Sequence, residues 1–251
     1  MELMQHIPDK SVDMILCDLP YGTTACEWDK VLPLDELWKQ YKRILKEDGV
    51  VVLTASQPFT TDLINSNRDW FRYEIIWMKS RKTNFANVNN MPLKSHENIL
   101  VFYKKLPTHN QTNLKKLQKP VKSWRKNGKG GNLYDNKLQT DKKRLQEYTN
   151  YNESVIKFNN EHNVNAHPTQ KPVELFRYLI KTYTNEGELV LDNCIGSGTT
   201  AVACKQANRN FIGIELSQEY VDIANKRLQQ DNLHAFFQTQ GVLTEPSPNR
   251  N

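Results

Sequence analysis

The feature that most constrains this sequence is a series of short, mostly apolar runs separated by segments with helical periodicity. Within these runs apolar side chains do not alternate regularly with polar ones. Strands that are apolar on both faces are typical of a largely parallel sheet with helices on each side. The runs that we expect to form strands are 12–17, 50–54, 73–77, 99–103, 188–192 and 211–215.

Helical patterns fill the gaps between these runs, as an alternating α/β chain requires. Apolar residues recur at helical spacing over 34–45, with Pro33 before them and Gly49 after them as start and stop signals. Further helices are expected after Pro58, after Pro172, over 199–206 and after Ser217. The prediction is an α/β, Rossmann-like fold with a mostly parallel sheet, helices on both faces and an inserted basic recognition region.

The positive charge of the chain is concentrated in one segment. The whole chain has a formal net charge of +6, yet 104–145 alone holds thirteen Lys and Arg against two acids. A solvated loop is one interpretation, because this composition buries little apolar surface. Trp124 and Tyr134 are interleaved with the cations, which favours contact with nucleic-acid phosphates and bases. The residues expected to contact DNA are Lys119, Lys122, Trp124, Arg125, Lys126 and Lys129.

A glycine turn follows the run 188–192 and precedes a predicted helix. Residues 196–201 have the form GxGxxA, which allows a tight turn, close approach of a ligand to the backbone, and access to free helical N–H groups. Glu215 ends the next strand, 17 residues after Gly198, near the spacing of an acid that accepts hydrogen bonds from ribose hydroxyls. We expect a nucleoside-containing cofactor here, the alternative being a turn that serves only helix packing.

A second turn, Asp18-Leu19-Pro20-Tyr21, follows the run 12–17. In an ordinary turn Pro20 would set the backbone and Tyr21 would pack. In a functional turn, Asp18 and the carbonyl of Leu19 or Pro20 would accept the hydrogens of an exocyclic amine while Tyr21 stacks on its ring. Such contacts would localise the lone pair of a poorly nucleophilic amine and position it for reaction.

Together these motifs resemble those of the amino-group DNA methyltransferases, which use S-adenosylmethionine. Residues 18–21 are similar to the D-P-P-Y turn of the family, 192–200 to its F-x-G-x-G loop, and 167–172 (HPTQKP) to the stretch that precedes that loop. The catalytic turn precedes the basic region and the glycine loop follows it, as in the permuted β group. Leu19 and Cys194 stand where the family has proline and phenylalanine.

The resemblance implies a site-specific enzyme of DNA methylation that transfers a methyl group from S-adenosylmethionine to N6 of adenine in double-stranded DNA, as in restriction-modification. Aspartate at the first position of the turn favours adenine over N4 of cytosine, which stays an alternative. RNA, a protein amide, a dehydrogenase reaction and a catalytically inactive DNA-binding subunit are the others. The catalytic residues implied are Asp18, Leu19, Pro20 and Tyr21. The cofactor-binding residues implied are Lys171, Asp192, Cys194, Ile195, Gly196, Ser197, Gly198, Thr199 and Glu215.

The remaining features bound the organisation of the chain. No apolar run reaches the roughly 18 residues of a membrane span, and the four cysteines show no metal-binding or disulfide pattern. We therefore expect a cytoplasmic protein without a metal, and a homodimer is the one oligomeric state that we consider. The expected parts are a catalytic half (1–103), a basic target-recognition insertion (104–166), a cofactor-binding half (167–235) and a mobile tail (236–251).

Overall fold

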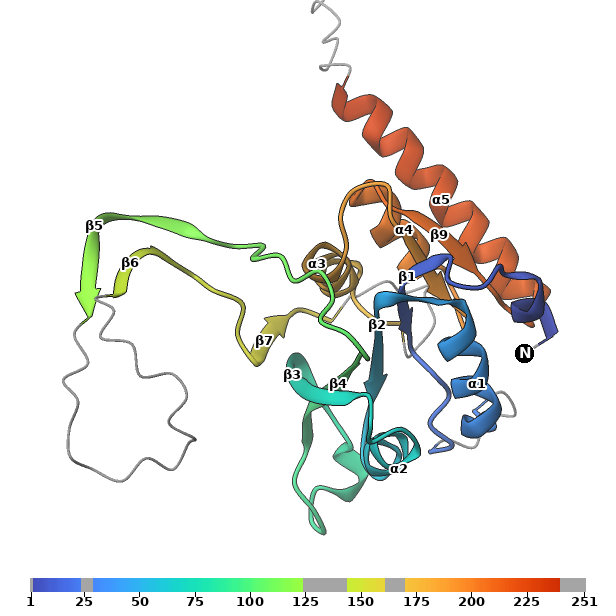
Figure 1. The fold of residues 1–251 in the computed structure, drawn as a ribbon. Helices are drawn as coiled ribbons and strands as arrows, with labels where there is room; N and C mark the ends of the chain where they lie inside the picture. The colour runs from blue at the N-terminus through green and yellow to red at the C-terminus, as the bar shows by residue number, and fades with distance from the viewer. Residues whose placement is uncertain (1, 24–28, 124–143, 161–169, 240–251) are drawn as a thin grey trace, which may run out of the picture. The chain divides into compact units, whose positions relative to one another are not determined.

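The computed structural model describes residues 2–23, 29–123, 144–160 and 170–239, with side chains up to residue 230 in the last range. The chain forms two compact units, which Figure 1 shows in ribbon form. The larger unit comprises residues 1–110 and 154–251, and the smaller comprises residues 111–153. No helix in the described ranges is long and apolar enough to cross a membrane.

The larger unit is built around a seven-stranded sheet with the order β7-β3-β4-β2-β1-β8-β9. Neighbouring strands are parallel except at β4, which is antiparallel to both β2 and β3. The predicted mostly parallel sheet is therefore confirmed. The strands are β1 (Val12–Cys17), β2 (Leu45–Ala55), β3 (Phe71–Thr83), β4 (Lys94–Phe102), β7 (Val155–Phe158), β8 (Leu189–Asp192) and β9 (Asn210–Gly213).

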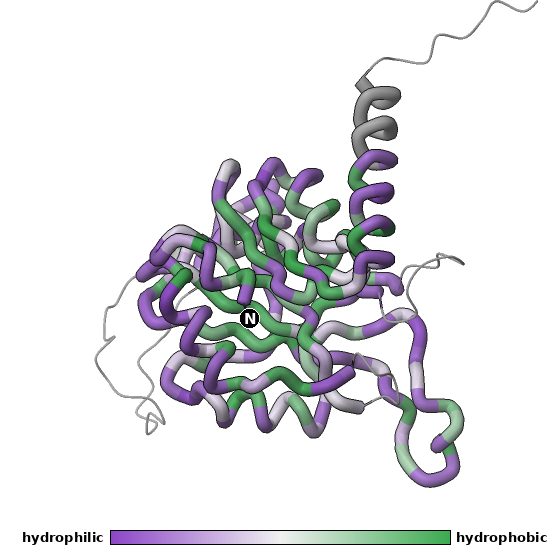
Figure 2. Tube along the Cα trace, turned by 90° about the vertical axis from the view of Figure 1, so that its right-hand side faces the viewer, coloured by the Kyte–Doolittle hydropathy of each residue, from purple (hydrophilic) through white to green (hydrophobic). Residues whose placement is uncertain are grey.

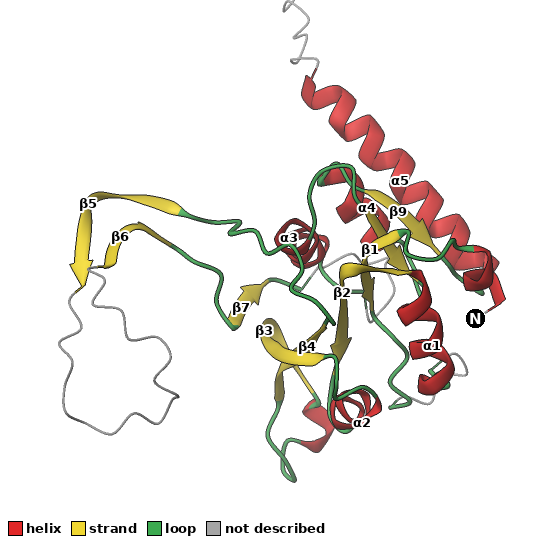
Figure 3. Cartoon of the chain, in the orientation of Figure 1, coloured by secondary structure: helices red, strands yellow, loops and turns green. Residues whose placement is uncertain are grey.

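Helices cover both faces of this sheet, as Figure 3 shows. Alternate residues of β1 reveal the two layers. Met14 and Leu16 pack with residues of α3 (Val173–Tyr183) and α4 (Thr199–Gln206), whereas Ile15 and Cys17 pack with residues of α1 (Leu34–Ile44) and α2 (Phe59–Ser66). Most residues of β1 and β2 are buried, and Figure 2 shows hydrophobic stretches along the trace of the larger unit. The Rossmann-like fold class is confirmed. The remaining helices are η1 (Glu2–His6), η2 (Phe85–Asn87) and α5 (Gln218–Thr239).

Gly49 does not end a helix, contrary to the prediction. Helix α1 ends at Ile44 and β2 begins at the next residue, so Gly49 lies inside a strand. A Cβ atom on Gly49 would come within 2.9 Å of the carbonyl oxygen of Asp13. The glycine therefore permits close approach of β1 and β2 where their pairing shifts register.

One edge of the sheet collects the polar ends of several strands. The carboxyl ends of β1, β2 and β8 meet there because these strands are parallel. Since β4 runs in the opposite direction, its first residues lie at the same edge, and Asn98 pairs with Ala55 near the end of β2. Residues far apart in the sequence are thereby brought together at this edge.

The smaller unit contains an antiparallel pair, β5 (Lys115–Ser123) and β6 (Arg144–Thr149). Residues 124–143, which connect these strands, lie outside the described residues. Strand β7 falls within the segment 104–166 that we assigned to the insertion, but it pairs with β3 of the large sheet, Ile76 opposite Val155. Helix α5 extends to Thr239, and the rest of the predicted tail, 240–251, is not described.

Candidate active site

Asp18 follows β1 directly, and three side chains hold its carboxylate. The Tyr21 hydroxyl donates a hydrogen bond to Oδ1 at 2.7 Å, and the Thr54 hydroxyl donates to the same oxygen. The Lys171 ammonium donates to Oδ2 at 2.7 Å. A carboxylate accepts about four hydrogen bonds, so these contacts orient Asp18 and leave it capacity for another donor.

Thr54 was not identified from the sequence. It lies in β2 next to Leu53, which pairs with Cys17, so Thr54 is level with Asp18 on the neighbouring strand. Its side chain is fully buried. The only signal in the sequence is a polar residue near the end of an apolar strand, which becomes informative once β1 and β2 are known to be neighbours.

Lys171 belongs to a buried cluster of alternating charges. Its ammonium lies 2.7 Å from Asp18 Oδ2 and 3.2 Å from Glu97 Oε2, and the Lys79 ammonium lies 3.2 Å from Glu97 Oε1. The Lys171 and Lys79 side chains are only 8% and 6% exposed, so each cation needs its partners to offset desolvation. Burial alone would lower the pKa of Lys171, but nearby negative charge, chiefly that of Asp18, raises it well above its ordinary value.

The cluster changes the picture of Lys171 that the sequence suggested. We expected Lys171 to contact the cofactor, whereas its ammonium forms ion pairs with Asp18 and Glu97. Its backbone carbonyl accepts a hydrogen bond from the Thr199 hydroxyl at 3.4 Å, which links it to the glycine turn. A direct cofactor contact by Lys171 stays a prediction. Neither Glu97 nor Lys79 was assigned a role from the sequence, because only the antiparallel pairing of β3 and β4 brings them together.

The ring of Tyr21 contacts two residues from later parts of the chain. It stacks on Phe59 of α2 with centroids 5.4 Å apart and planes at 23°, and the Lys171 Nζ atom lies 5.5 Å from its centroid. Burial, and then the charge of Asp18, raise the pKa of Tyr21 well above its ordinary value, so the hydroxyl stays a donor. The Leu19 side chain is buried in the core and Pro20 is half-buried. Stacking of Tyr21 on a base stays a prediction.

Asp29 supports the backbone that follows Tyr21 and was also not identified from the sequence. Its side-chain oxygens accept hydrogen bonds from the Gly22 N–H at 2.8 Å and from the Thr23 N–H at 2.9 Å. Asp29 is 7% exposed, and Gly22 has a left-handed φ of 67°. The carboxylate therefore stabilises a turn that glycine adopts at little cost.

The two glycines of the turn between β8 and α4 have different roles. Gly196 has a φ of 50°, and a Cβ placed on it would meet nothing within 4 Å, so its backbone faces open space. Gly198 has a φ of 83°, and its Cβ would lie 2.7 Å from the Cβ of Ala224 in α5. Thus Gly198 serves helix packing, whereas Gly196 leaves room for a ligand.

Asp192 and Glu215 hold this turn through its backbone. Asp192 accepts hydrogen bonds from the Cys194 N–H at 3.0 Å and from the Thr200 hydroxyl, and burial raises its pKa from 3.8 to about 6. Glu215 accepts the Gly196 N–H at 2.9 Å on Oε2, and two further backbone N–H groups on Oε1. One acceptor position of roughly four remains on Glu215. The exposed Leu216 adds an apolar surface beside it.

The other predicted cofactor residues anchor the turn to the protein. Arg227 of α5 donates to the Ser197 carbonyl at 2.7 Å, and the Ser197 hydroxyl donates to Gln170 at 3.2 Å. The Ile195 N–H donates to the Ile214 carbonyl at 3.0 Å. Cys194 packs partly buried against the α1 side of the core. The turn is thus tied to β9, to α5 and to the segment before α3.

The Asp18 cluster and the glycine turn are adjacent. Strands β1 and β8 are parallel neighbours, with Ile15 opposite Leu191, so Asp18 and Asp192 leave the sheet at the same edge. The negative charge of Asp18 contributes to the raised pKa of Asp192, as expected of groups this near. This edge therefore brings the Asp18 carboxylate and its partners beside the glycine turn.

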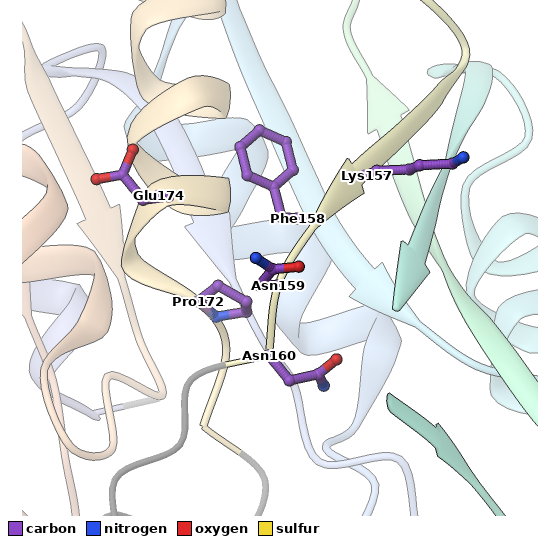
Figure 4. Close-up of a pocket in the computed structure, with 6 residues that line it drawn as sticks. All are labelled: Lys157, Phe158, Asn159, Asn160, Pro172 and Glu174. Carbon is purple, nitrogen blue, oxygen red and sulfur yellow. The ribbon is translucent and has the colours of Figure 1, made fainter. Parts of the chain in front are cut away.

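A separate hollow of about 420 Å³ lies where β7 ends and α3 begins (Figure 4). Figure 4 shows Lys157 and Glu174 pointing in opposite directions, so their charges do not converge as ligand sites require. We assign it no role. The hollow is lined by Lys157, Phe158, Asn159, Asn160, Pro172 and Glu174.

In the described ranges, no group of three His, Cys, Asp or Glu side chains could hold a metal ion.

The predicted DNA contacts fall in the smaller unit. Lys119 and Lys122 lie on β5 and are exposed. Trp124, Arg125, Lys126 and Lys129 lie outside the described residues.

Comparison with known proteins relates this chain to DNA methylases. Residues 12–226 match the N6_N4_Mtase family, described as DNA methylase. The chain is 28% identical to type II methyltransferase M.HpaI of Haemophilus parainfluenzae and 30% identical to M.HinfI of Haemophilus influenzae, with 91% of this chain aligned in each case. The alignments span 71% of M.HpaI and 66% of M.HinfI. The crystal structure of the M1.HpyAVI–SAM complex is similar, with a TM-score of 0.58 and 28% identity over 87% of this chain and 89% of that one.

Proposed function

Because this chain belongs to the DNA methylase family, we propose that it transfers a methyl group from S-adenosylmethionine to the N6 amino group of adenine in double-stranded DNA. The predicted family, enzyme class and cofactor are confirmed by the family match and by the similarity to M1.HpyAVI, whose structure contains SAM. The observation that carries the site assignment is the Asp18 carboxylate, held by Tyr21, Thr54 and Lys171 beside the glycine turn.

The glycine turn fits the cofactor. The open space at Gly196 admits a ligand close to the backbone, and Glu215 retains an acceptor position for a ribose hydroxyl. When bound, S-adenosylmethionine supplies an electrophilic methyl group on a sulfonium. Asp192 stabilises the turn by accepting hydrogen bonds from the Cys194 N–H and the Thr200 hydroxyl.

The residues of the clamp prepare the amine. Asp18 Oδ2 accepts one N–H of the target amine, and the carbonyl of Leu19 or Pro20 accepts the other. These contacts draw the nitrogen toward tetrahedral geometry and localise its lone pair. Tyr21, Thr54 and Lys171 prevent the carboxylate from rotating, so its orientation is set before the substrate arrives. As the bond from N6 to the methyl carbon forms, the bond from that carbon to the sulfonium sulfur would break and leave a neutral thioether; N6 would lose one proton, which Asp18 would accept.

The test is product analysis. The full chain is incubated with isotopically labelled S-adenosylmethionine and unmethylated DNA, and the nucleosides are identified by mass spectrometry. We expect labelled N6-methyldeoxyadenosine, whereas labelled N4-methyldeoxycytidine would favour the cytosine alternative. A wild-type chain that binds DNA but no cofactor in calorimetry would favour an inactive DNA-binding subunit.

A variant tests the clamp itself. Asp18→Ala should abolish methyl transfer while the dissociation constant of S-adenosylmethionine changes by no more than about threefold, because Asp18 acts on the amine and not on the cofactor. Retained transfer in Asp18→Ala would remove the clamp from the mechanism. Sequencing that detects methylated bases, applied to DNA from cells that express the wild-type chain, would identify the target site.

The basic segment supplies the other half of the proposed function. Lys119 and Lys122 on β5 are exposed and available to phosphates of double-stranded DNA. Trp124, Arg125, Lys126 and Lys129 complete the proposed contact set. The division of the chain at 104–166, a homodimer and a cytoplasmic location stay predictions.

A further inference from the structure

The turn between β3 and β4 carries an apolar ridge that the catalytic site does not use. Phe85, Val88 and Met91 are 63%, 53% and 50% exposed. They are spaced three residues apart, and the turn contains successive 3₁₀-type hydrogen bonds, from Asn87 N–H to the Asn84 carbonyl and from Val88 N–H to the Phe85 carbonyl, both at 3.2 Å. The short helix η2 ends at Asn87, and the turn that follows it contains Val88 and Met91, so the three exposed apolar side chains lie within seven residues of one turn. Clustered exposed apolar side chains mark interaction sites more often than scattered ones.

This turn leaves the sheet at the catalytic edge. Trp77 pairs with Glu97, and further along the same hairpin Thr83 pairs with Lys94. Glu97 is in ion-pair contact with Lys171, and Lys171 with Asp18. The ridge therefore begins a few residues beyond the charge cluster. Figure 1 shows the turn on the side of the sheet toward which the arrow of β2 points.

Cations frame the ridge without any acid. The segment 79–94 contains four Lys and Arg and no Asp or Glu. Lys79 forms an ion pair with Glu97. The other three cations, Arg81, Lys82 and Lys94, are exposed. Apolar side chains framed by cations complement a polyanion that offers apolar surface between its charges, as a DNA duplex does where a base step is opened. A second copy of the same turn would bring like charges together.

We propose that this ridge enters the DNA stack at the position that the target base vacates, with Phe85 as the stacking residue and Val88 and Met91 beside it. The inference rests on the proposed function, because a base must leave the duplex to reach Asp18. An aromatic ring of suitable size replaces the lost stacking partner and slows return of the base. Arg81, Lys82 and Lys94 contact the flanking phosphates.

The test compares Phe85→Ala with Leu106→Ala, which removes an apolar side chain of 79% exposure outside the turn. Single-turnover methylation is measured on two duplexes that carry the target site: one fully paired, and one with an abasic site opposite the target adenine. We expect Phe85→Ala to be at least about tenfold slower than wild type on the paired duplex and within about threefold on the pre-opened one. Leu106→Ala should match wild type on both, and Phe85→Trp should retain most of the rate.

Other outcomes separate the two proposals. A wild-type chain that methylates neither duplex would contradict the proposed function. If the wild type is active, a Phe85→Ala variant that is as fast as wild type on paired DNA would overturn the proposed insertion of the ridge. A variant that is slowed equally on both duplexes would do the same. Neither result would contradict the proposed function. Sedimentation velocity in the absence of DNA provides a second readout: a wild-type dimer that Phe85→Ala dissociates would assign the ridge to self-association and overturn the proposal.

Discussion

At the scale of single residues, the ammonium of Lys171 has the greatest influence on how Asp18 is presented. It is buried between two carboxylates, and it is bonded to the Asp18 oxygen that retains acceptor capacity. Removing one partner of a buried ion pair costs about 3–5 kcal/mol, because the remaining charge is left without compensation. Loss of the ammonium also leaves Asp18 Oδ2 without the donor that orients it, so an effect should appear in the reaction rate even where the fold survives.

Lys171→Met should lower the single-turnover rate by about two orders of magnitude, with a dissociation constant for S-adenosylmethionine close to that of wild type. Lys79→Met is the matched control, because Lys79 contacts Glu97 and not Asp18 in the cluster. It should stay within about fivefold of wild type. Calorimetry and rapid-quench methylation measure both quantities. If Lys171→Met instead binds S-adenosylmethionine more weakly but reacts at a normal rate when saturated, Lys171 contacts the cofactor, as the sequence suggested.

Asp192 gives a prediction about pH. Burial raises its pKa from 3.8 to about 6, so the folded protein holds this proton more tightly than the unfolded chain. Its contribution to the free energy of unfolding is therefore greatest at low pH and falls as pH rises through this window, by up to about 3 kcal/mol. Asp192→Asn removes the titration. Urea unfolding of both proteins at several pH values should show the stability of wild type relative to the variant falling between about pH 4 and 6, and a constant difference would contradict the assignment.

At the scale of elements, the glycine turn contains a matched pair of test positions. Gly196→Ala should lower the free energy of unfolding by about 1 kcal/mol, the cost of placing alanine in a left-handed backbone conformation. It adds no steric clash, because nothing lies within 4 Å of the added Cβ. Gly198→Ala adds a contact of 2.7 Å with Ala224 and should cost a further 1–3 kcal/mol, roughly, in the free energy of unfolding.

The two variants should therefore separate packing from binding. Gly196→Ala should keep nearly wild-type stability in urea unfolding yet bind S-adenosylmethionine at least about tenfold more weakly, since its methyl group fills the proposed cradle. Gly198→Ala should lose stability first. Unchanged cofactor affinity in Gly196→Ala would place the ligand elsewhere.

At the level of helices and strands, local sequence patterns predicted most elements of the large sheet and its covering helices. Six strands and the helices after Pro58 and Pro172 follow from apolar periodicity and punctuation. Strand β7 was missed because it has four residues, of which only Ile156 is buried, and its pairing with β3 spans some eighty residues of sequence. Gly49 was misread because a glycine after a helical pattern can equally mark close strand approach.

The site divides in the same way. Asp18 and Gly196 belong to contiguous motifs and were visible in the sequence. Thr54, Phe59 and Glu97 reach Asp18, Tyr21 and Lys171 only through strand order and helix packing, so no local pattern assigns them a role in the site. The antiparallel direction of β4 is the decisive long-range fact, because it places the start of that strand at the catalytic edge.

At the scale of the whole molecule, the uneven charge distribution predicts how DNA is bound. The segment 104–145 carries far more positive charge than the net +6 of the chain, so the remainder is net negative. DNA should therefore be held through few, localised phosphate contacts and not through overall attraction. Each neutralised phosphate contributes about 0.9 to the slope of log affinity against log salt concentration.

A pair of double variants distinguishes local contact from net charge. Lys119→Gln/Lys122→Gln removes two exposed cations from β5, and Lys39→Gln/Lys226→Gln removes two exposed cations from α1 and α5, so the net charge falls equally. The first should reduce the salt slope by nearly 2, and the second by less than about 0.5. Fluorescence anisotropy with a duplex probe at several salt concentrations measures both slopes. Equal reductions would mean that DNA responds to the total charge of the molecule, and the smaller unit would lose its assigned role in contacting phosphates.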